Sequence, residues 1–305
     1  FTGAEGFLAV SKICSNFSKE LNIKEKNIFT ASTGVIGEPL VWQKIVKGSS
    51  KLKLGLSDEG IKGAAEAIMT TDTFAKGASR KFNINDELIK ISGIAKGSGM
   101  IKPNMATMLA YVATDAAVDD ELLHRALTLA TEASFNRITV DSDTSTNDSV
   151  VLVATGASGV SIDETSFEHF VEQLGKVFVD LAQAIIRDGE GATKFVSVVI
   201  ESAASQAEAL QVAYTIAESP LVKTALSASD PNWGRILAAI GRSGISDLDV
   251  NEVQLLLNSV LIADHGARAS TYSEEAGKAA MQPEDIEIRV RLNRGSITET
   301  VWTTD

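Results

Sequence analysis

The sequence predicts a mixed α/β protein in which helices cover layered β-sheets. Short runs rich in β-branched and aromatic residues alternate with amphipathic helical patterns along most of the 305 residues. The clearest helical pattern covers residues 163–189, where apolar side chains recur every three or four positions and form one stripe. The length and the 44% hydrophobic content suit about two domains with sizeable cores.

Six helices and nine strands are predicted from these patterns. The helices cover residues 5–21, 58–69, 119–133, 163–189, 205–217 and 232–242. Gly189 is expected to end the long helix. The strands cover residues 27–32, 87–95, 107–113, 136–141, 149–155, 192–201, 252–263, 285–293 and 297–303. The turn at 189–194 suggests a boundary near residue 195, so that residues 1–195 form the core domain and residues 196–305 a smaller C-terminal α/β domain.

Charge and composition narrow the function classes. The 28 Lys and Arg residues against 40 Asp and Glu residues give a net charge of -12, without a basic cluster or tail. This balance argues against nucleic acid or an anionic membrane as the main partner and favours small-molecule chemistry. No apolar run approaches the roughly 18 residues that would suggest a membrane span.

Cysteine and histidine usage excludes a disulfide framework and makes a zinc site improbable. The single cysteine, Cys14, lies at helical spacing with apolar residues and is expected in the core. His124, His169 and His265 are far apart and match no zinc-binding pattern, so no metal is expected. The cytoplasm is the expected compartment for a chain with one cysteine.

Four polar or glycine-rich clusters interrupt the apolar pattern, at residues 31–40, 70–76, 95–108 and 140–148. Each one alone is compatible with an ordinary turn. None matches a phosphate-binding loop, and the 140–148 cluster lacks the glycine and glutamate of a calcium loop. The run Asp141-x-Asp143-x-Ser145 after an apolar strand resembles the nucleophile motif of haloacid dehalogenase-like phosphotransferases, but the match is loose and lies far from the N-terminus.

The step between Ala106 and Thr107 carries a distinct chemistry. A threonine hydroxyl is a weak nucleophile near neutral pH and needs a neighbouring base. If the hydroxyl of Thr107 attacked the Ala106 carbonyl and the peptide bond were cut through an ester, the freed α-amino group would become that base, with a pKa of about 7.7–8.0. Pro103 and Asn104, just upstream, favour a bend at this place.

Six segments together resemble the ornithine acetyltransferase family, also called glutamate N-acetyltransferase, of arginine biosynthesis. They occur in the family's order and extend over nearly the whole chain: ASTGVIGEPL (31–40), IMTTDTFAK (68–76), KGSGMIKPNMATMLAYVATDA (96–116), FNRITVDSDTSTNDSV (135–150), RDGEGATKF (187–195) and SDPNWGRILAAIGRSG (229–244). The resemblance implies a self-cleaving N-terminal-threonine enzyme with a layered αββα core and a smaller C-terminal α/β domain.

Carried over position by position, the resemblance implies the roles of the site residues. Thr107 would be the nucleophile, with cleavage between Ala106 and Thr107. Thr33 and Gly34 match the oxyanion-stabilising pair. Thr70, Lys96 and Glu190 match substrate-binding positions, with Lys96 suited to a substrate carboxylate and Glu190 to the ornithine amine.

The implied reaction is a two-step transfer of the acetyl group of N2-acetylornithine to glutamate through acetyl-Thr107. No bound cofactor is expected; acetyl-CoA is a second acetyl donor in the bifunctional members, and no motif here separates them from monofunctional ones. The implied partners are the α and β chains of one precursor, residues 1–106 and residues 107 onward, in a homo-oligomer of such pairs. Relative to the family, this sequence is expected to be truncated at both ends.

Two alternatives remain open at the level of sequence. One is an aminopeptidase or amidase of the same self-processing superfamily, which would release its product to water. The other is an unprocessed relative that binds the amino acid without catalysis.

Overall fold

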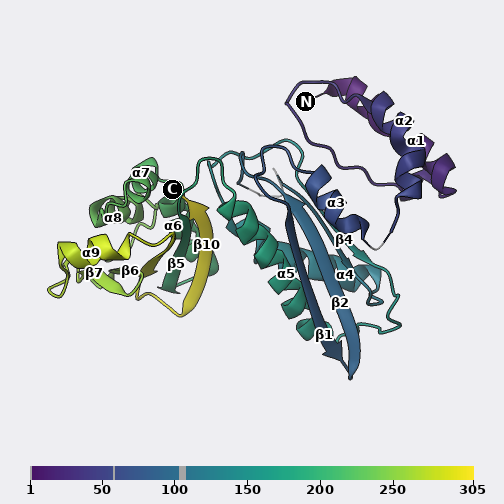
Figure 1. Ribbon diagram of the computed structural model, residues 1–305. Helices are drawn as coiled ribbons and strands as arrows, with labels where there is room; N and C mark the ends of the chain where they lie inside the picture. The colour runs from purple at the N-terminus through teal and green to yellow at the C-terminus, as the bar shows by residue number, and fades with distance from the viewer. Residues whose placement is uncertain (1, 58, 103–107) are drawn as a thin grey trace.

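Two β-sheets, each packed against helices, form the body of the protein, and a pair of helices lies apart from them at the N-terminal end (Figure 1). The computed structural model describes residues 2–57, 59–102 and 108–305. The two sheets mix parallel and antiparallel strands. The predicted mixed α/β class is therefore confirmed.

The first sheet has the strand order β1-β2-β3-β4. Its strands are β1 (Lys76–Ile84), β2 (Glu87–Lys96), β3 (Leu109–Thr114) and β4 (Ser149–Ala154). The strands β1, β2 and β3 pair antiparallel, whereas β3 and β4 pair parallel. Asn85 and Asp86, with φ of 51° and 65°, connect β1 to β2. Two consecutive left-handed residues suit the right-handed twist of a hairpin, which accounts for this tight turn.

Two helices cover one face of the first sheet. Helix α5 (Phe167–Arg187) packs along β1 and β2, and α4 (Asp120–Glu132) packs against α5 (Figure 1). The apolar stripe of α5 is almost wholly buried in the first core, which includes Phe170, Leu174 and Leu181. Helix α4 begins at Asp119, whose side chain accepts a hydrogen bond from the Leu122 amide. A short helix, α3 (Gly60–Ala67), lies beside β2.

The second sheet has the order β10-β5-β9-β6-β7-β8 and a core of its own. Helix α6 packs on β5 and β10, and α8 packs on α6. The strands and helices are β5 (Phe195–Ala203), α6 (Gln206–Ala217), α7 (Pro220–Ser227), α8 (Trp233–Gly241), β6 (Gln254–Leu257), β7 (Val260–Asp264), β8 (Ala267–Arg268), α9 (Glu274–Ala280), β9 (Asp285–Arg291) and β10 (Ile297–Thr304). The first buried core ends at Phe195 and the second begins at Val196. The division into two domains near residue 195 stays a prediction.

Helices α1 (Gly3–Leu21) and α2 (Trp42–Leu54) pack against each other (Figure 1). A 3₁₀ turn, η1 (Glu25–Asn27), follows α1. Cys14 is buried in this pair, as the helical spacing predicted.

All six predicted helices are present, and seven of the predicted strand regions contain strands. The region 252–263 is divided into β6 and β7 by a turn at Asn258, which has a φ of 51°. Helices α2, α7 and α9 and strands β1 and β8 were missed. Strand β1 escaped notice because three charged residues, Lys76, Arg80 and Lys81, interrupt its apolar alternation.

Two predicted strands and one helix stop are wrong. Residues 27–32 form no strand, and 136–141 forms a 3₁₀ turn, η2 (Phe135–Arg137), followed by one isolated bridge between Ile138 and Trp302. Helix α5 ends at Arg187, before Gly189. Gly189 does not have a positive φ; a Cβ there would lie 2.8 Å from the Thr304 Cγ2 atom, so close packing requires this glycine.

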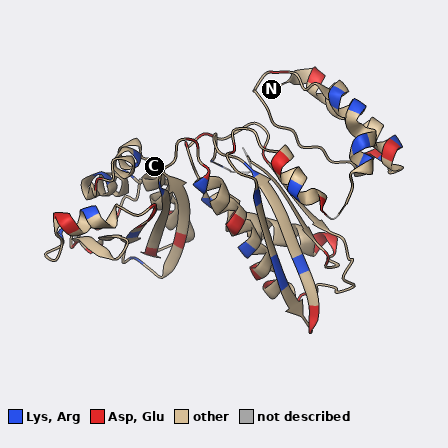
Figure 2. Cartoon of the chain, viewed as in Figure 1, with Lys and Arg blue, Asp and Glu red and all other residues tan. Residues whose placement is uncertain are grey.

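Acidic and basic residues are interspersed on α5, as Figure 2 shows. Over the described residues, no helix has the length and apolar character needed to cross a membrane.

Gly93→Ala should destabilise the protein by about 1–3 kcal/mol, because the new methyl group would overpack the junction of β2 with β3 and α5. A Cβ at Gly93 would lie 2.7 Å from Val112 Cγ2 and 3.2 Å from Leu181 Cδ1. Urea denaturation followed by circular dichroism measures the change. Gly77→Ala on β1 is the matched control, since a Cβ there meets nothing nearer than 3.7 Å. Equal stability of both variants would contradict this packing argument.

Candidate active site

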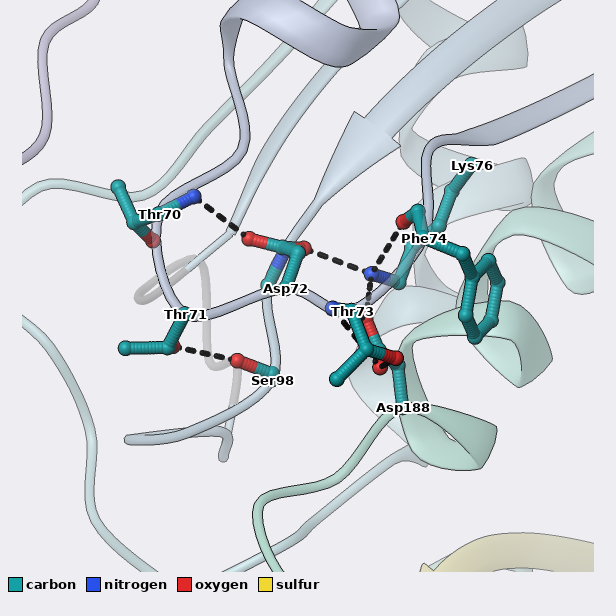
Figure 3. Close-up of polar contacts among 9 residues, drawn as sticks. Thr70, Thr71, Asp72, Thr73, Phe74, Lys76, Ser98 and Asp188 are labelled. Carbon is teal, nitrogen blue, oxygen red and sulfur yellow. Dashed lines mark hydrogen bonds and ion pairs between the residues drawn. The ribbon is translucent and has the colours of Figure 1, made fainter.

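A buried ion cluster centred on Lys76 joins two of the sequence motifs, and a hydrogen bond from the Gly97 amide to Asp72 connects a third (Figure 3). The Lys76 Nζ atom lies 2.6 Å from Asp72 Oδ1 and 2.5 Å from Asp188 Oδ2, and its side chain is fully buried. Lys76 begins β1, Asp72 lies in the preceding turn, and Asp188 follows the last residue of α5. Because a buried charge needs a partner, this lysine connects the sheet, the turn and the helix end.

The Asp72 carboxylate also organises the backbone around it. It accepts hydrogen bonds from the Thr70 amide at 3.0 Å and from the Gly97 amide at 2.6 Å. Burial by itself would raise the pKa of Asp72. The hydrogen bonds from Lys76, Thr70 and Gly97 outweigh burial and hold the pKa below its usual value. The carboxylate thus stays charged and keeps the 70–76 turn against the end of β2.

The turn after α5 packs on the turn after β2. The Glu190 amide donates to the Ser98 carbonyl oxygen at 2.9 Å, and the hydroxyl groups of Thr71 and Ser98 are 2.6 Å apart (Figure 3). A Cβ at Gly99 would lie 2.7 Å from the Glu190 Cδ atom. Only a glycine lets the exposed Glu190 carboxyl approach this backbone so closely. Thr73 adds a second connection, since its amide and hydroxyl donate to Asp188.

The 140–148 loop is hydrogen-bonded to the backbone of residues 100–102. Asp141 accepts hydrogen bonds from the amides of Met100 at 2.5 Å and Ile101 at 3.0 Å. The Thr144 hydroxyl donates to the Lys102 carbonyl oxygen at 3.1 Å. Asp141 therefore fixes the backbone just before residues 103–107, and this contact gives it a structural role in place of the phosphotransferase role considered from the sequence.

The predicted oxyanion pair lies beside the same loop. The Asn147 side-chain amide donates to the carbonyl oxygen of Ser32, the neighbour of Thr33. Thr33 is half-buried and Gly34 is exposed. Among the described residues, neither the Thr33 hydroxyl nor the Gly34 amide makes a hydrogen bond, so both donors are free to bind an oxyanion.

Lys96, the last residue of β2, is buried and is paired in the sheet with Leu109, the first residue of β3. Burial lowers the pKa of Lys96, and Lys76 adds to this effect, whereas Asp72, Asp148 and Glu190 oppose it. Its ammonium group makes no hydrogen bond to the part of the chain that the structure describes. A buried cation without such a partner is suited to an anionic ligand.

The predicted site residues fall into three groups. Thr70, Lys96 and Glu190 lie near the Lys76 cluster, and Thr33 and Gly34 follow Ser32, which is hydrogen-bonded to Asn147 of the 140–148 loop. Ala106 and Thr107 lie outside the described residues. Met108, which follows Thr107 in the sequence, is buried, and its carbonyl oxygen accepts a hydrogen bond from the Ser149 amide at 2.9 Å.

Sequence reasoning missed Asp72, Lys76, Asp148 and Asp188 as parts of the site. Asp72 and Lys76 stand in the quoted TTDTFAK motif, but nothing in the sequence shows that a lysine at the start of a strand is buried. The described residues contain no group of three or more His, Cys, Asp or Glu side chains arranged to hold a metal ion.

Comparison with known proteins identifies the family. The sequence matches the ArgJ family over residues 1–305. This chain belongs to the ArgJ family. The match confirms the resemblance carried by the six motifs.

Two relatives of this ArgJ-family chain have the name arginine biosynthesis bifunctional protein ArgJ. The one from Pseudomonas fluorescens (strain Pf0-1) is 49% identical and the one from Pseudomonas syringae pv. tomato (strain ATCC BAA-871 / DC3000) is 48% identical, each over 308 residues. Both alignments cover 100% of this chain and 76% of the relative.

A solved structure is also similar. The crystal structure of arginine biosynthesis bifunctional protein ArgJ from Bacillus halodurans aligns with a TM-score of 0.62 and 39% identity. The alignment covers 65% of this chain and 94% of that one.

Lys76→Met should destabilise this ArgJ-family protein by about 3–5 kcal/mol at pH 7, because it leaves two buried carboxylates without a cation. The loss should shrink as the pH falls toward about 4, since protonation of Asp72 removes part of the uncompensated charge. The wild type, by contrast, should lose stability in acid. The pKa of Asp72 is lower in the folded protein than in the unfolded chain, so its ionised form stabilises the fold above about pH 4, and this contribution is lost as the pH falls through the folded pKa.

Urea denaturation at several pH values measures both effects. Lys81→Met, at an exposed position of the same strand, is the control and should change little. A deficit for Lys76→Met that does not depend on pH would contradict the charge argument and point to packing alone.

Proposed function

We propose that this protein is an ornithine acetyltransferase of arginine biosynthesis that moves the acetyl group of N2-acetylornithine to glutamate. Membership of the ArgJ family supports the reaction. One observation supports the assignment of residues: the motif segments meet at Lys76, at Lys96 and at the 140–148 loop, next to the start of β3. Segments distant in the sequence thus surround the strand that follows Thr107.

The proposed nucleophile is Thr107, freed by cleavage of the bond to Ala106. Its hydroxyl attacks the Ala106 carbonyl carbon, the acyl group moves from nitrogen to oxygen, and water then hydrolyses the ester. This leaves a carboxylate on Ala106 and an α-amino group on Thr107. That amine, with a pKa of about 7.7–8.0, is the base that the threonine hydroxyl needs.

Transfer then takes two acyl exchanges. The Thr107 hydroxyl gives its proton to the amine and attacks the acetyl carbonyl of N2-acetylornithine. Ornithine leaves with that proton, and acetyl-Thr107 remains. The glutamate amine attacks the ester, and its surplus proton passes through the same base to the threonine oxygen. Thr33 and Gly34 donate to the oxyanion in both steps, a contribution of about 3 kcal/mol for a donor of this kind.

Substrate recognition is assigned to Thr70, Lys96 and Glu190. Lys96 is a buried ammonium group without a hydrogen-bond partner among the described residues, and it would pair with the substrate carboxylate. Glu190, exposed at the turn after α5, would bind the ornithine side-chain amine. One cation and one anion at fixed positions match a substrate that carries both charges.

The transfer so described uses only groups of the protein, so we propose that it needs no metal or bound cofactor. Acetyl-CoA would enter as a second acetyl-donor substrate, since its thioester presents the same acetyl carbonyl to Thr107. We further propose that the cleaved α and β chains stay together as a pair, that pairs assemble into a homo-oligomer, and that the enzyme acts in the cytoplasm.

Thr107→Ala should abolish both self-cleavage and acetyl transfer, because it removes the attacking oxygen. Thr107→Ser should retain part of both, since the hydroxyl and the latent amine survive. Intact-mass spectrometry after mixing with N2-acetylornithine measures cleavage and the gain of one acetyl group on the fragment that begins at residue 107. Thr128→Ala, on helix α4, is the control and should behave as the wild type. Wild-type transfer by the alanine variant would require another nucleophile.

Turnover of N2-acetylornithine should depend on glutamate beyond the first acetylation of the enzyme. Without glutamate, ornithine release should stop after about one equivalent per active site, because acetyl-Thr107 has no amine acceptor. Measuring ornithine with and without glutamate separates a transferase from an amidase of the same superfamily. Continued release in the absence of glutamate would favour the amidase.

A further inference from the structure

Asp148 is a buried acid that the proposed reaction does not use. It is the last residue before β4, whose first residue, Ser149, pairs with Leu109 of β3. Both carboxyl oxygens of Asp148 are buried, and neither has a hydrogen-bond partner within normal distance among the described residues. Buried carboxyl groups are rarely left in this state, because an ionised one costs several kcal/mol without a partner. Such a group calls for a functional explanation.

The charged group that acts on Asp148 is Lys96, on the far side of β3 in the strand order. Lys96 pairs with Leu109 from β2, and Ser149 pairs with the same residue from β4. Lys96 and Asp148 therefore flank the beginning of β3, and each lies close enough to shift the pKa of the other.

The other charges near Lys96 are already engaged or exposed. Asp72, from the turn before β1, is neutralised by Lys76, and Glu190, from the turn after α5, is open to solvent. Around Lys96 this leaves Asp148 as the buried carboxyl group without a salt bridge in the described part of the chain.

The burial of both carboxyl oxygens, without a hydrogen-bond partner in the described chain, favours the protonated form of Asp148 at neutral pH. Burial raises its pKa to about 8, and the Lys96 cation and the Met108 amide act in the opposite direction without overcoming burial. A protonated Asp148 does not compete for the Lys96 ammonium group. An ionised Asp148 would add a second buried anion near Lys96, besides Asp72, which Lys76 already neutralises.

We propose that Asp148 is a positioning residue that acts through Lys96: as a neutral acid it leaves the Lys96 cation free for the substrate carboxylate, and as an anion it claims that cation. This inference rests on the proposed function, because it takes Lys96 as the group that binds the carboxylate. The protonated acid thus sets which anion the lysine pairs with.

The direction of the pH effect follows from linkage. Substrate binding prefers the protonated acid, so affinity falls as the pH rises through about 8. N2-acetylornithine is the suitable probe, since its α-amine is acetylated and its side-chain amine has a pKa near that of lysine, about 10.4. The Thr107 amine also loses its proton near pH 8, which would raise kcat because the free amine is the base. Ionisation of Asp148 would instead raise KM, because it weakens substrate binding.

Steady-state kinetics at saturating glutamate test the proposal. For the wild type, KM for N2-acetylornithine should rise about tenfold between pH 7 and pH 9, because the protonated fraction of an acid with a pKa of about 8 falls about tenfold over this range. In Asp148→Asn this rise should vanish, because the amide stays neutral. Asp143→Asn, at an exposed position in the same loop, is the control and should keep the wild-type profile. A flat wild-type KM, or a rise that persists in Asp148→Asn, would overturn the proposal.

A second measurement does not depend on activity. Infrared difference spectra between pH 6 and pH 10 should contain the C=O band of a protonated carboxylic acid that titrates near pH 8, and the band should be absent in Asp148→Asn. In Lys96→Met its midpoint should move to higher pH, because the cation that favours ionisation is gone. A midpoint that stays unchanged in Lys96→Met would show that Asp148 is not coupled to Lys96, and it would overturn the inference.

The two measurements separate the proposals. If the enzyme failed to transfer acetyl groups while the infrared band titrated and moved as expected, the proposed function would fall and the coupling of Asp148 with Lys96 would stand. If transfer were normal and the band or the KM profile did not respond, the role of Asp148 alone would fall.

Discussion

The ion pairs of Lys76 with Asp72 and Asp188 are the interaction on which the candidate site depends. They connect the turn before β1, the end of α5 and the start of the first sheet, and the Asp72 carboxylate extends the connection to Gly97 after β2. Each carboxylate is buried, so removal of the lysine would leave charges that the interior cannot solvate. The proposed substrate-binding positions Thr70, Lys96 and Glu190 are next to this cluster in the chain or in space, so the cluster contributes to their placement.

The ionisable groups around the start of β3 differ in how many hydrogen bonds they make, and this difference sets the direction in which the pKa of each is shifted. Asp72 is surrounded by donors, which hold its pKa below the usual value, whereas the carboxyl oxygens of Asp148 are buried without them, and burial raises its pKa. Both carboxyl groups act on the pKa of Lys96, whose ammonium group makes no hydrogen bond in the described chain. Two carboxyl groups in the same small region thus have pKa values shifted in opposite directions, a feature that is common at functional sites.

The local pattern of apolar residues was enough to predict many of the helices and strands. The stripe of α5 and the runs at β2, β4, β9 and β10 were predicted from apolar periodicity alone, because these elements bury one face or a whole run against a core. Prediction failed where a partner decides the outcome. Strand β1 carries charges that a local pattern assigns to solvent, and residues 136–141 form only one bridge, while Asp141 binds the amides of Met100 and Ile101.

By itself the sequence determined the family, the reaction chemistry and the identity of the candidate residues, since motif order and residue type are properties of the chain. Thr33, Gly34, Thr70, Lys96, Thr107 and Glu190 were all named from it. Only the tertiary structure decided which charges are buried and which are paired: that Lys76 is a fully enclosed cation and that Asp148 is an acid without a partner among the described residues. The physical reason is that the charge state of an ionisable group depends on its solvation and on neighbours from other segments, and neither is encoded in the local pattern of residues.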